Sequence, residues 1–146
     1  MRIRYGFVLW LVLGLLLTGC ATPTPAVKPQ AVASPTATVL AMPVDVTPKM
    51  VEDLRSTGAI ALIDVREPEE YAEGRIPGAV LIPLGELSKR LDEVPTDKPV
   101  VLVCRSGNRS TQALQLLQKA GFTNVHNMTG GMRAWIAAGY TIEADR

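Results

Sequence analysis

The sequence predicts an α/β fold in which a parallel β-sheet is covered by helices on both faces. Short apolar segments alternate along the chain with segments whose apolar residues recur at helical spacing. Such alternation is typical of parallel sheets, because the crossover to the next parallel strand is usually a helix. At 146 residues the chain has room for one domain, and no internal repeat is visible.

The predicted elements follow one another from about residue 44. Strands are predicted at 44–46, 59–65, 79–82, 100–103 and 124–127. Helices are predicted from Pro48 to Gly58 and at 67–73, 110–120 and 131–138, and a further helical pattern joins Leu84, Leu87, Leu91 and Val94. The first helix begins favourably, because Thr47 can cap it and proline occupies its first position.

Residues 1–19 predict a signal peptide that targets the chain for export. Arg2 and Arg4 flank an apolar stretch at 7–17, and small residues follow it. This apolar stretch is too short for a comfortable membrane span, which needs roughly 20 apolar residues. The alternative is a single-pass anchor that is retained.

The tetrad Leu17-Thr18-Gly19-Cys20 resembles the bacterial lipoprotein signal, or lipobox. The resemblance implies cleavage before Cys20, a diacylglyceryl group on its sulfur and often acylation of the new amino group. Two or more acyl chains make membrane anchoring stable. We therefore expect a lipid-anchored protein of the cell envelope whose domain lies outside the cytoplasm.

Residues 20–43 predict an extended tether between the lipidated Cys20 and a domain at 44–146. The segment is rich in Pro, Thr and Ala, and it contains no aromatic residue and no usable periodicity. The formal net charge of the chain is +1, close to balance, so the charge gives no reason to expect a nucleic-acid partner.

One thiol stands at the carboxyl end of the most apolar predicted strand. Cys104 follows the strand at 100–103, and a polar loop and a helical pattern come next. Ligands tend to bind at this end of the strands in α/β folds, and a helix N-terminus favours an anion. A thiolate is an anion, so this position should lower the pKa of the thiol and make it a nucleophile.

Two other interpretations of Cys104 compete with catalysis. A free cysteine is often an inert buried residue, and an exported chain with two cysteines can form a disulfide, here with Cys20. Lipidation of Cys20 would leave Cys104 without a partner. The loop after Cys104 favours catalysis, because Gly107 can help its N–H groups to point inward as an anion-binding nest.

The loop also carries two cationic side chains, Arg105 and Arg109, and either Ser110 or Thr111 can cap the helix that follows. The Cys-x4-Arg spacing is one residue shorter than the Cys-x5-Arg phosphate loop of cysteine phosphatases. A shorter ring encloses a smaller pocket, which suits one terminal sulfur atom better than a phosphate. The spacing therefore favours sulfur transfer over phosphate hydrolysis.

Four motifs follow one another along the chain: Leu62–Tyr71, Gly74–Ala79, Cys104–Ser110, and Asn127–Met132 followed by Trp135. Over about residues 44–140 they resemble, in the same order, the motifs of single-domain rhodanese (thiosulfate sulfurtransferase-like) proteins. The resemblance implies a five-stranded parallel sheet between helices and a cysteine persulfide intermediate. It implies a small sulfur-containing anion such as thiosulfate as donor and a thiol, cyanide or thioredoxin-like acceptor.

By position, the resemblance makes Cys104 the nucleophile and persulfide carrier. The backbone N–H groups of the next six residues become its cradle: Arg105, Ser106, Gly107, Asn108, Arg109 and Ser110. Arg105 and Arg109 become contacts for an anionic donor. Asp64 and Arg66, at the end of the neighbouring strand, either support the site or form a structural ion pair.

Two further positions bear on this interpretation. The family usually has histidine where this chain has Arg75. His126 is the single histidine, and we interpret it as a half-exposed strand residue rather than the base of a Cys–His dyad. One histidine and one free cysteine do not supply the usual ligand set of a metal site, so we predict no metal and no cofactor.

Two other functions remain open from the sequence. One is a binding module of the same fold that delivers sulfur to a partner and has little turnover of its own. The other is a phosphatase or arsenate reductase of the related fold, which the short loop disfavours.

Overall fold

The computed structural model describes residues 42–145 of the chain. The predicted signal peptide, the predicted lipidation site Cys20 and nearly all of the predicted tether lie outside these residues. Within residues 42–145, no helix is long and apolar enough to cross a membrane.

Five parallel strands form one sheet, as predicted, and the structure gives their order as β1-β5-β4-β2-β3. The strands are β1 (Asp45–Val46), β2 (Ala61–Asp64), β3 (Val80–Leu81), β4 (Val100–Val103) and β5 (Val125–Met128). The helices are α1 (Pro48–Arg55), α2 (Pro68–Glu73), α3 (Asn108–Lys119) and α4 (Gly131–Ala137), with 3₁₀ helices η1 (Leu87–Lys89) and η2 (Leu91–Glu93).

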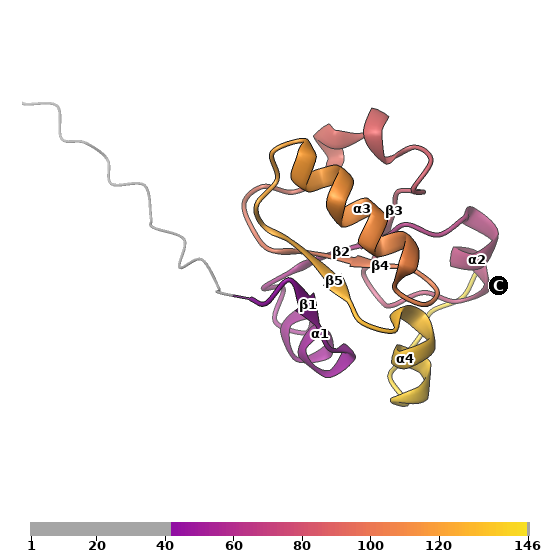
Figure 1. Cartoon of the computed structure of the whole chain (residues 1–146). Helices are drawn as coiled ribbons and strands as arrows, with labels where there is room; N and C mark the ends of the chain where they lie inside the picture. Colours follow the sequence, from indigo (N-terminus) through magenta and orange to yellow (C-terminus); the bar gives the residue numbers. More distant parts are fainter. Residues whose placement is uncertain (1–41, 146) are drawn as a thin grey trace, which may run out of the picture. The chain divides into compact units, whose positions relative to one another are not determined.

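Helices cover both faces of the sheet, which confirms the predicted layers (Figure 1). Side chains of β4 alternate between the faces, because successive residues of a strand point to opposite sides. Leu102 and Cys104 face the core under α3, whereas Val101 and Val103 face the core under α1 and α4. Trp135 of α4 is completely buried in the second core.

The predicted cap of α1 is present. Thr47 has extended backbone angles, and its hydroxyl oxygen accepts a hydrogen bond from Met50 N at 3.3 Å. Pro48 occupies the start of the helix, where the absence of an N–H group costs nothing. The regular helix ends at Arg55, before the predicted end, and a turn leads to Gly58, whose φ is +72°.

The helical pattern at 84–94 forms two 3₁₀ turns and not one helix. Arg90, between the turns, has φ −124° and ψ 32°, outside the helical region. Its guanidinium binds the carboxylates of Glu86 and Glu93 on either side. Leu87, in the first of these turns, is completely buried. A 3₁₀ helix is wound more tightly than an α-helix.

The helix after the cysteine loop begins two residues earlier than predicted. Gly107 is its N-cap residue, with a left-handed φ of +101°. The hydroxyl oxygens of Ser110 and Thr111 lie 3.0 and 2.8 Å from the carbonyl oxygen of Gly107, and neither side chain caps the helix as predicted. The glycine ends the loop by backbone geometry, which leaves the Ser110 hydroxyl next to the thiol.

Candidate functional site

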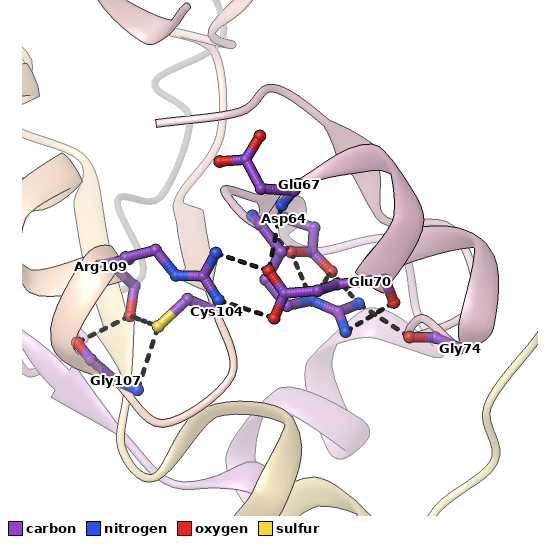
Figure 2. Close-up of polar contacts among 9 residues, drawn as sticks. Asp64, Glu67, Glu70, Gly74, Cys104, Gly107 and Arg109 are labelled. Atoms are coloured by element: carbon purple, nitrogen blue, oxygen red, sulfur yellow. Dashed lines mark hydrogen bonds and ion pairs between the residues drawn. The ribbon is translucent and has the colours of Figure 1, made fainter. Parts of the chain in front are cut away.

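The Cys104 thiol lies directly after β4, at the carboxyl end of the sheet, inside the loop that follows it (Figure 2). Gly107 N donates a hydrogen bond to the Cys104 sulfur at 3.1 Å, and the Ser110 hydroxyl lies 3.4 Å from it. The cysteine is 1% exposed and forms no disulfide within the described part of the chain. The loop from Cys104 to Ser110 therefore forms a ring beside the sulfur, in which Gly107 supplies a backbone hydrogen bond and Ser110 a hydroxyl.

The ring alters the acidity of the thiol. Burial raises the pKa of Cys104, but hydrogen bonds from the Ser110 hydroxyl and from the N–H groups of Ser110, Ser106 and Gly107 lower it. The hydrogen bonds prevail, so the pKa of Cys104 lies below that of an ordinary cysteine. A larger share of the group is then thiolate near neutral pH, which is the reactive form.

Helix α4 holds the start of the loop from behind. Met132 N donates to Cys104 O at 2.8 Å, and Arg133 N donates to Arg105 O at 3.1 Å. This close approach requires glycine at 131, because a Cβ atom there would overlap Cys104 O and lie 2.8 Å from Arg105 C. The glycine pair at 130–131 is thus a packing turn.

Arg109 is held by a carboxylate from a different element. Its two terminal nitrogens bind the two oxygens of Glu70, on α2, at 2.6 and 2.8 Å (Figure 2). Hydrogen bonding to Arg109 is the main cause that lowers the pKa of Glu70, which falls to about 2. The charge of Arg109 is therefore already balanced, and its predicted contact with an anionic donor stays a prediction.

Asp64 and Arg66 form a buried ion pair that positions α2. Arg66 binds both carboxylate oxygens of Asp64, at 2.6 to 2.9 Å, and its guanidinium also donates to Glu70 O and Gly74 O. Asp64 is fully buried and Arg66 is 6% exposed. The pair holds α2 in place, and through α2 it fixes the carboxylate that binds Arg109.

The other loop residues predicted for the site are Arg105, Ser106 and Asn108. The Ser106 N–H helps to lower the pKa of Cys104, and Arg105 and Asn108 are exposed. Arg105 lines a cavity of about 360 Å³ beside the loop. The other residues that line the cavity come from the segment between β2 and α2, from α2 and from α4: Arg66, Glu70, Glu73, Met132, Arg133 and Ile136.

His126 and Arg75, the two further positions considered in the sequence, both lie away from the cysteine loop. His126 is buried rather than half-exposed, because β5 is an interior strand between β1 and β4, and its Nδ1 lies 2.8 Å from Pro43 O. The Arg75 guanidinium stacks over the ring of Tyr71 at 4.7 Å and lies 2.8 Å from the Asp145 carboxylate. Neither residue contacts the loop.

Sequence reasoning gave no role to Glu70 or to Asn127 at this site. Asn127 Oδ1 accepts a hydrogen bond from the Ser110 hydroxyl at 2.7 Å, and its Nδ2 donates to Asp45 at 2.8 Å. Both residues fall inside the quoted motifs, but the motifs alone do not show which side chains meet. As for metals, residues 42–145 contain no group of three or more His, Cys, Asp or Glu side chains that could hold an ion.

The family model of the rhodanese-like domain matches residues 47–138. A protein of Allochromatium vinosum named sulfurtransferase is 42% identical over 91 residues, which are 62% of this chain and 85% of that protein. Bacillus subtilis YqhL, described as uncharacterized, is 50% identical over 74 residues, or 51% of this chain and 59% of that protein.

The same architecture occurs among solved structures. The human single-domain sulfurtransferase TSTD1 superposes with a TM-score of 0.61 at 33% sequence identity, covering 66% of this chain and 97% of that chain.

Proposed function

Because the chain belongs to the rhodanese-like domain family, we propose that it is a sulfurtransferase that carries sulfur as a persulfide on Cys104. Relatives named sulfurtransferases support the activity in general, and the hydrogen-bonded ring around the Cys104 sulfur is the observation that carries the proposal. The proposed donor is a small sulfur-containing anion such as thiosulfate. The proposed acceptor is a thiol, cyanide or a thioredoxin-like protein.

The proposed reaction has two displacements at sulfur. The Cys104 thiolate attacks the outer sulfur of thiosulfate, forming a Cys104 S–S bond while the donor's S–S bond breaks and sulfite leaves with the electron pair. A nucleophilic acceptor then attacks the terminal sulfur and releases the thiolate. Each step exchanges one sulfur–sulfur bond or transfers one sulfur atom, so no external oxidant or reductant is needed.

The loop's N–H groups support this chemistry by their direction. The Gly107 N–H already points at the sulfur from 3.1 Å, and a terminal persulfide sulfur is an anion of the same kind. The exposed side chain of Arg105 lines the cavity, and its positive charge can attract an anionic donor. The short Cys-x4-Arg ring disfavours the alternative of a phosphatase or arsenate reductase.

Intact mass spectrometry tests the proposal. The purified chain is incubated with thiosulfate, the excess donor is removed, and the intact mass is measured. We expect a gain of about one sulfur atom, ~32 Da, that cyanide reverses and that Cys104→Ser lacks, as an activated thiolate requires. No gain, while Cys104 remains open to alkylation, would reject thiosulfate as donor.

The same variant separates the second candidate, a sulfur-delivery or binding module. Such a module keeps its partner when Cys104 is replaced by serine, whereas a sulfurtransferase loses its reaction. A steady rate of thiocyanate formation from thiosulfate and cyanide supports the enzyme. A single stoichiometric transfer without turnover supports the module.

We also propose that Cys20 carries lipid and anchors the domain to a membrane outside the cytoplasm. The support is the sequence from Leu17 to Cys20 and the charged, apolar segment before it. The test is partition of the bacterially expressed chain into a detergent phase. We expect the wild-type chain in the detergent phase and Cys20→Ser in the aqueous phase or unprocessed. Aqueous partition of the processed wild-type chain would reject the anchor.

A further inference from the structure

The Ser110 hydroxyl has one proton and three acceptors within reach. The distances from its oxygen are 2.7 Å to Asn127 Oδ1, 3.0 Å to Gly107 O and 3.4 Å to the Cys104 sulfur. Ser110 is completely buried, so the protein itself provides the alternatives. A hydroxyl donates only one hydrogen bond at a time, and the three acceptors therefore compete.

Asn127 Oδ1 is the nearest of the three acceptors, and it is also the most favourable one for the Ser110 proton. Gly107 O already accepts hydrogen bonds from Thr111 Oγ1 at 2.8 Å and from Thr111 N at 3.0 Å. Asn127 Oδ1 is buried and points at Ser110 from the adjacent strand β5. In the resting thiol, the Ser110 proton therefore belongs to Asn127.

Asp45 fixes the direction of the Asn127 amide. Asn127 Nδ2 lies 2.8 Å from Asp45 Oδ1, on the edge strand β1. A reversed amide would place its oxygen against this carboxylate, where two acceptors repel each other. The carboxylate thus keeps Oδ1, and not the NH₂ group, directed at Ser110.

We propose that Asn127 is a positioning residue that competes with the Cys104 sulfur for the Ser110 proton, and that Asp45 maintains this competition. This inference rests on the proposed function only in taking the Cys104 thiolate as the reacting group. When the thiol ionises, the hydroxyl turns to the sulfur, because a hydrogen bond to a charged acceptor is stronger. Asn127 Oδ1 then loses a donor inside the protein, which has a cost.

As a consequence, Asn127 opposes ionisation of the Cys104 thiol, and this effect can be removed without changing a residue of the loop. If Asn127 cannot accept, Ser110 can donate to the thiolate without leaving another buried group unpaired. The other charges near the sulfur stay the same: Arg109 on α3 and its partner Glu70 on α2 are not in the network. The buried pair of Asp64 and Arg66 is likewise unchanged.

The test is the pH dependence of Cys104 alkylation by iodoacetamide in the purified full chain, followed on the peptide that contains Cys104. Asn127→Leu removes the acceptor and keeps the volume. We expect the midpoint of the profile to fall, with the acid dissociation constant rising about threefold to tenfold. Asp45→Ala, at an exposed position, should shift the midpoint in the same direction by a smaller factor.

A double-mutant cycle shows whether the effect passes through Ser110. Ser110→Ala should raise the midpoint, and in that background Asn127→Leu should no longer change it. An unchanged or higher midpoint in folded Asn127→Leu, or an equal fall in the Ser110→Ala background, would overturn the inference.

If Asn127→Leu does not fold, Asp45→Ala decides the question in the same cycle: its shift must vanish in the Ser110→Ala background, because loss of the Asp45 charge alone would lower the midpoint in both backgrounds. Failure of the proposed function gives a different result. In that case no persulfide forms with thiosulfate, although the alkylation midpoints still move as described.

Discussion

Replacing Gly131 by alanine should displace the cysteine loop from its support. The residue opens α4 with a φ of +56°, in the left-handed region that favours glycine. A Cβ atom there would overlap Cys104 O and lie 2.8 Å from both Arg105 C and Ser106 N. All three atoms are backbone, so no side chain can rotate away to make room.

The size of the effect follows from these distances. Ordinary contact begins at 3.4 Å, so the backbone of Arg105 and Ser106 must withdraw from 2.8 Å by more than half an ångström, and Cys104 O must withdraw further. A misplacement of about 1 Å in a catalytic group can lower a rate about a hundredfold. We therefore expect sulfur transfer by Gly131→Ala to fall roughly tenfold to a hundredfold.

Gly139→Ala is the matched control. Gly139 follows the same helix with a φ of +75°, but a Cβ atom there would meet nothing within 4 Å. This variant isolates the left-handed backbone strain of about 1–2 kcal/mol. It should lower the urea midpoint and leave sulfur transfer and the Cys104 alkylation profile unchanged. Wild-type transfer and alkylation in Gly131→Ala would refute the steric argument.

Three further substitutions test the contacts around the loop. Asp64→Asn leaves the buried Arg66 guanidinium without its charged partner and should destabilise the fold by about 3–5 kcal/mol, seen as a urea midpoint at least about 1 M lower. Glu70 has a pKa of about 2 in the folded chain, below its usual 4.5, so its ion pair with Arg109 stabilises the fold above pH 4.5 and this contribution is lost as the pH falls toward 2. Glu70→Gln should therefore lower the urea midpoint at pH 7 and flatten its acid dependence, and an equally steep loss in the variant would contradict this. Arg75→His should reduce the urea midpoint but leave thiocyanate formation unchanged, because Arg75 does not contact the loop.

The alternation of strands and helices could be predicted from the sequence because it is a local property. Apolar periodicity and turn residues mark each element within a few positions. The pattern failed at 84–94, where the leucine spacing is helical but Arg90 leaves the helical region. It also missed the start of α3, where Gly107 takes a left-handed φ of +101° and lies against the turn between β5 and α4.

The predicted export signal and lipid anchor depend on the sequence alone. They rest on the order of charge, apolar core and small residues before Cys20, and residues 1–41 lie outside the described structure. They stay predictions, with the detergent partition of Cys20→Ser as their test.

The sequence by itself determined which thiol is the proposed nucleophile and which loop surrounds it, because Cys104 to Ser110 are consecutive and a short loop brings its own N–H groups together. Only the tertiary structure decided what surrounds that ring. Glu70 reaches Arg109 across 39 positions, and Asn127 reaches Asp45 across 82. Such pairs depend on the order of strands in the sheet and on where α2 is held, and neither is written in the spacing of neighbouring residues.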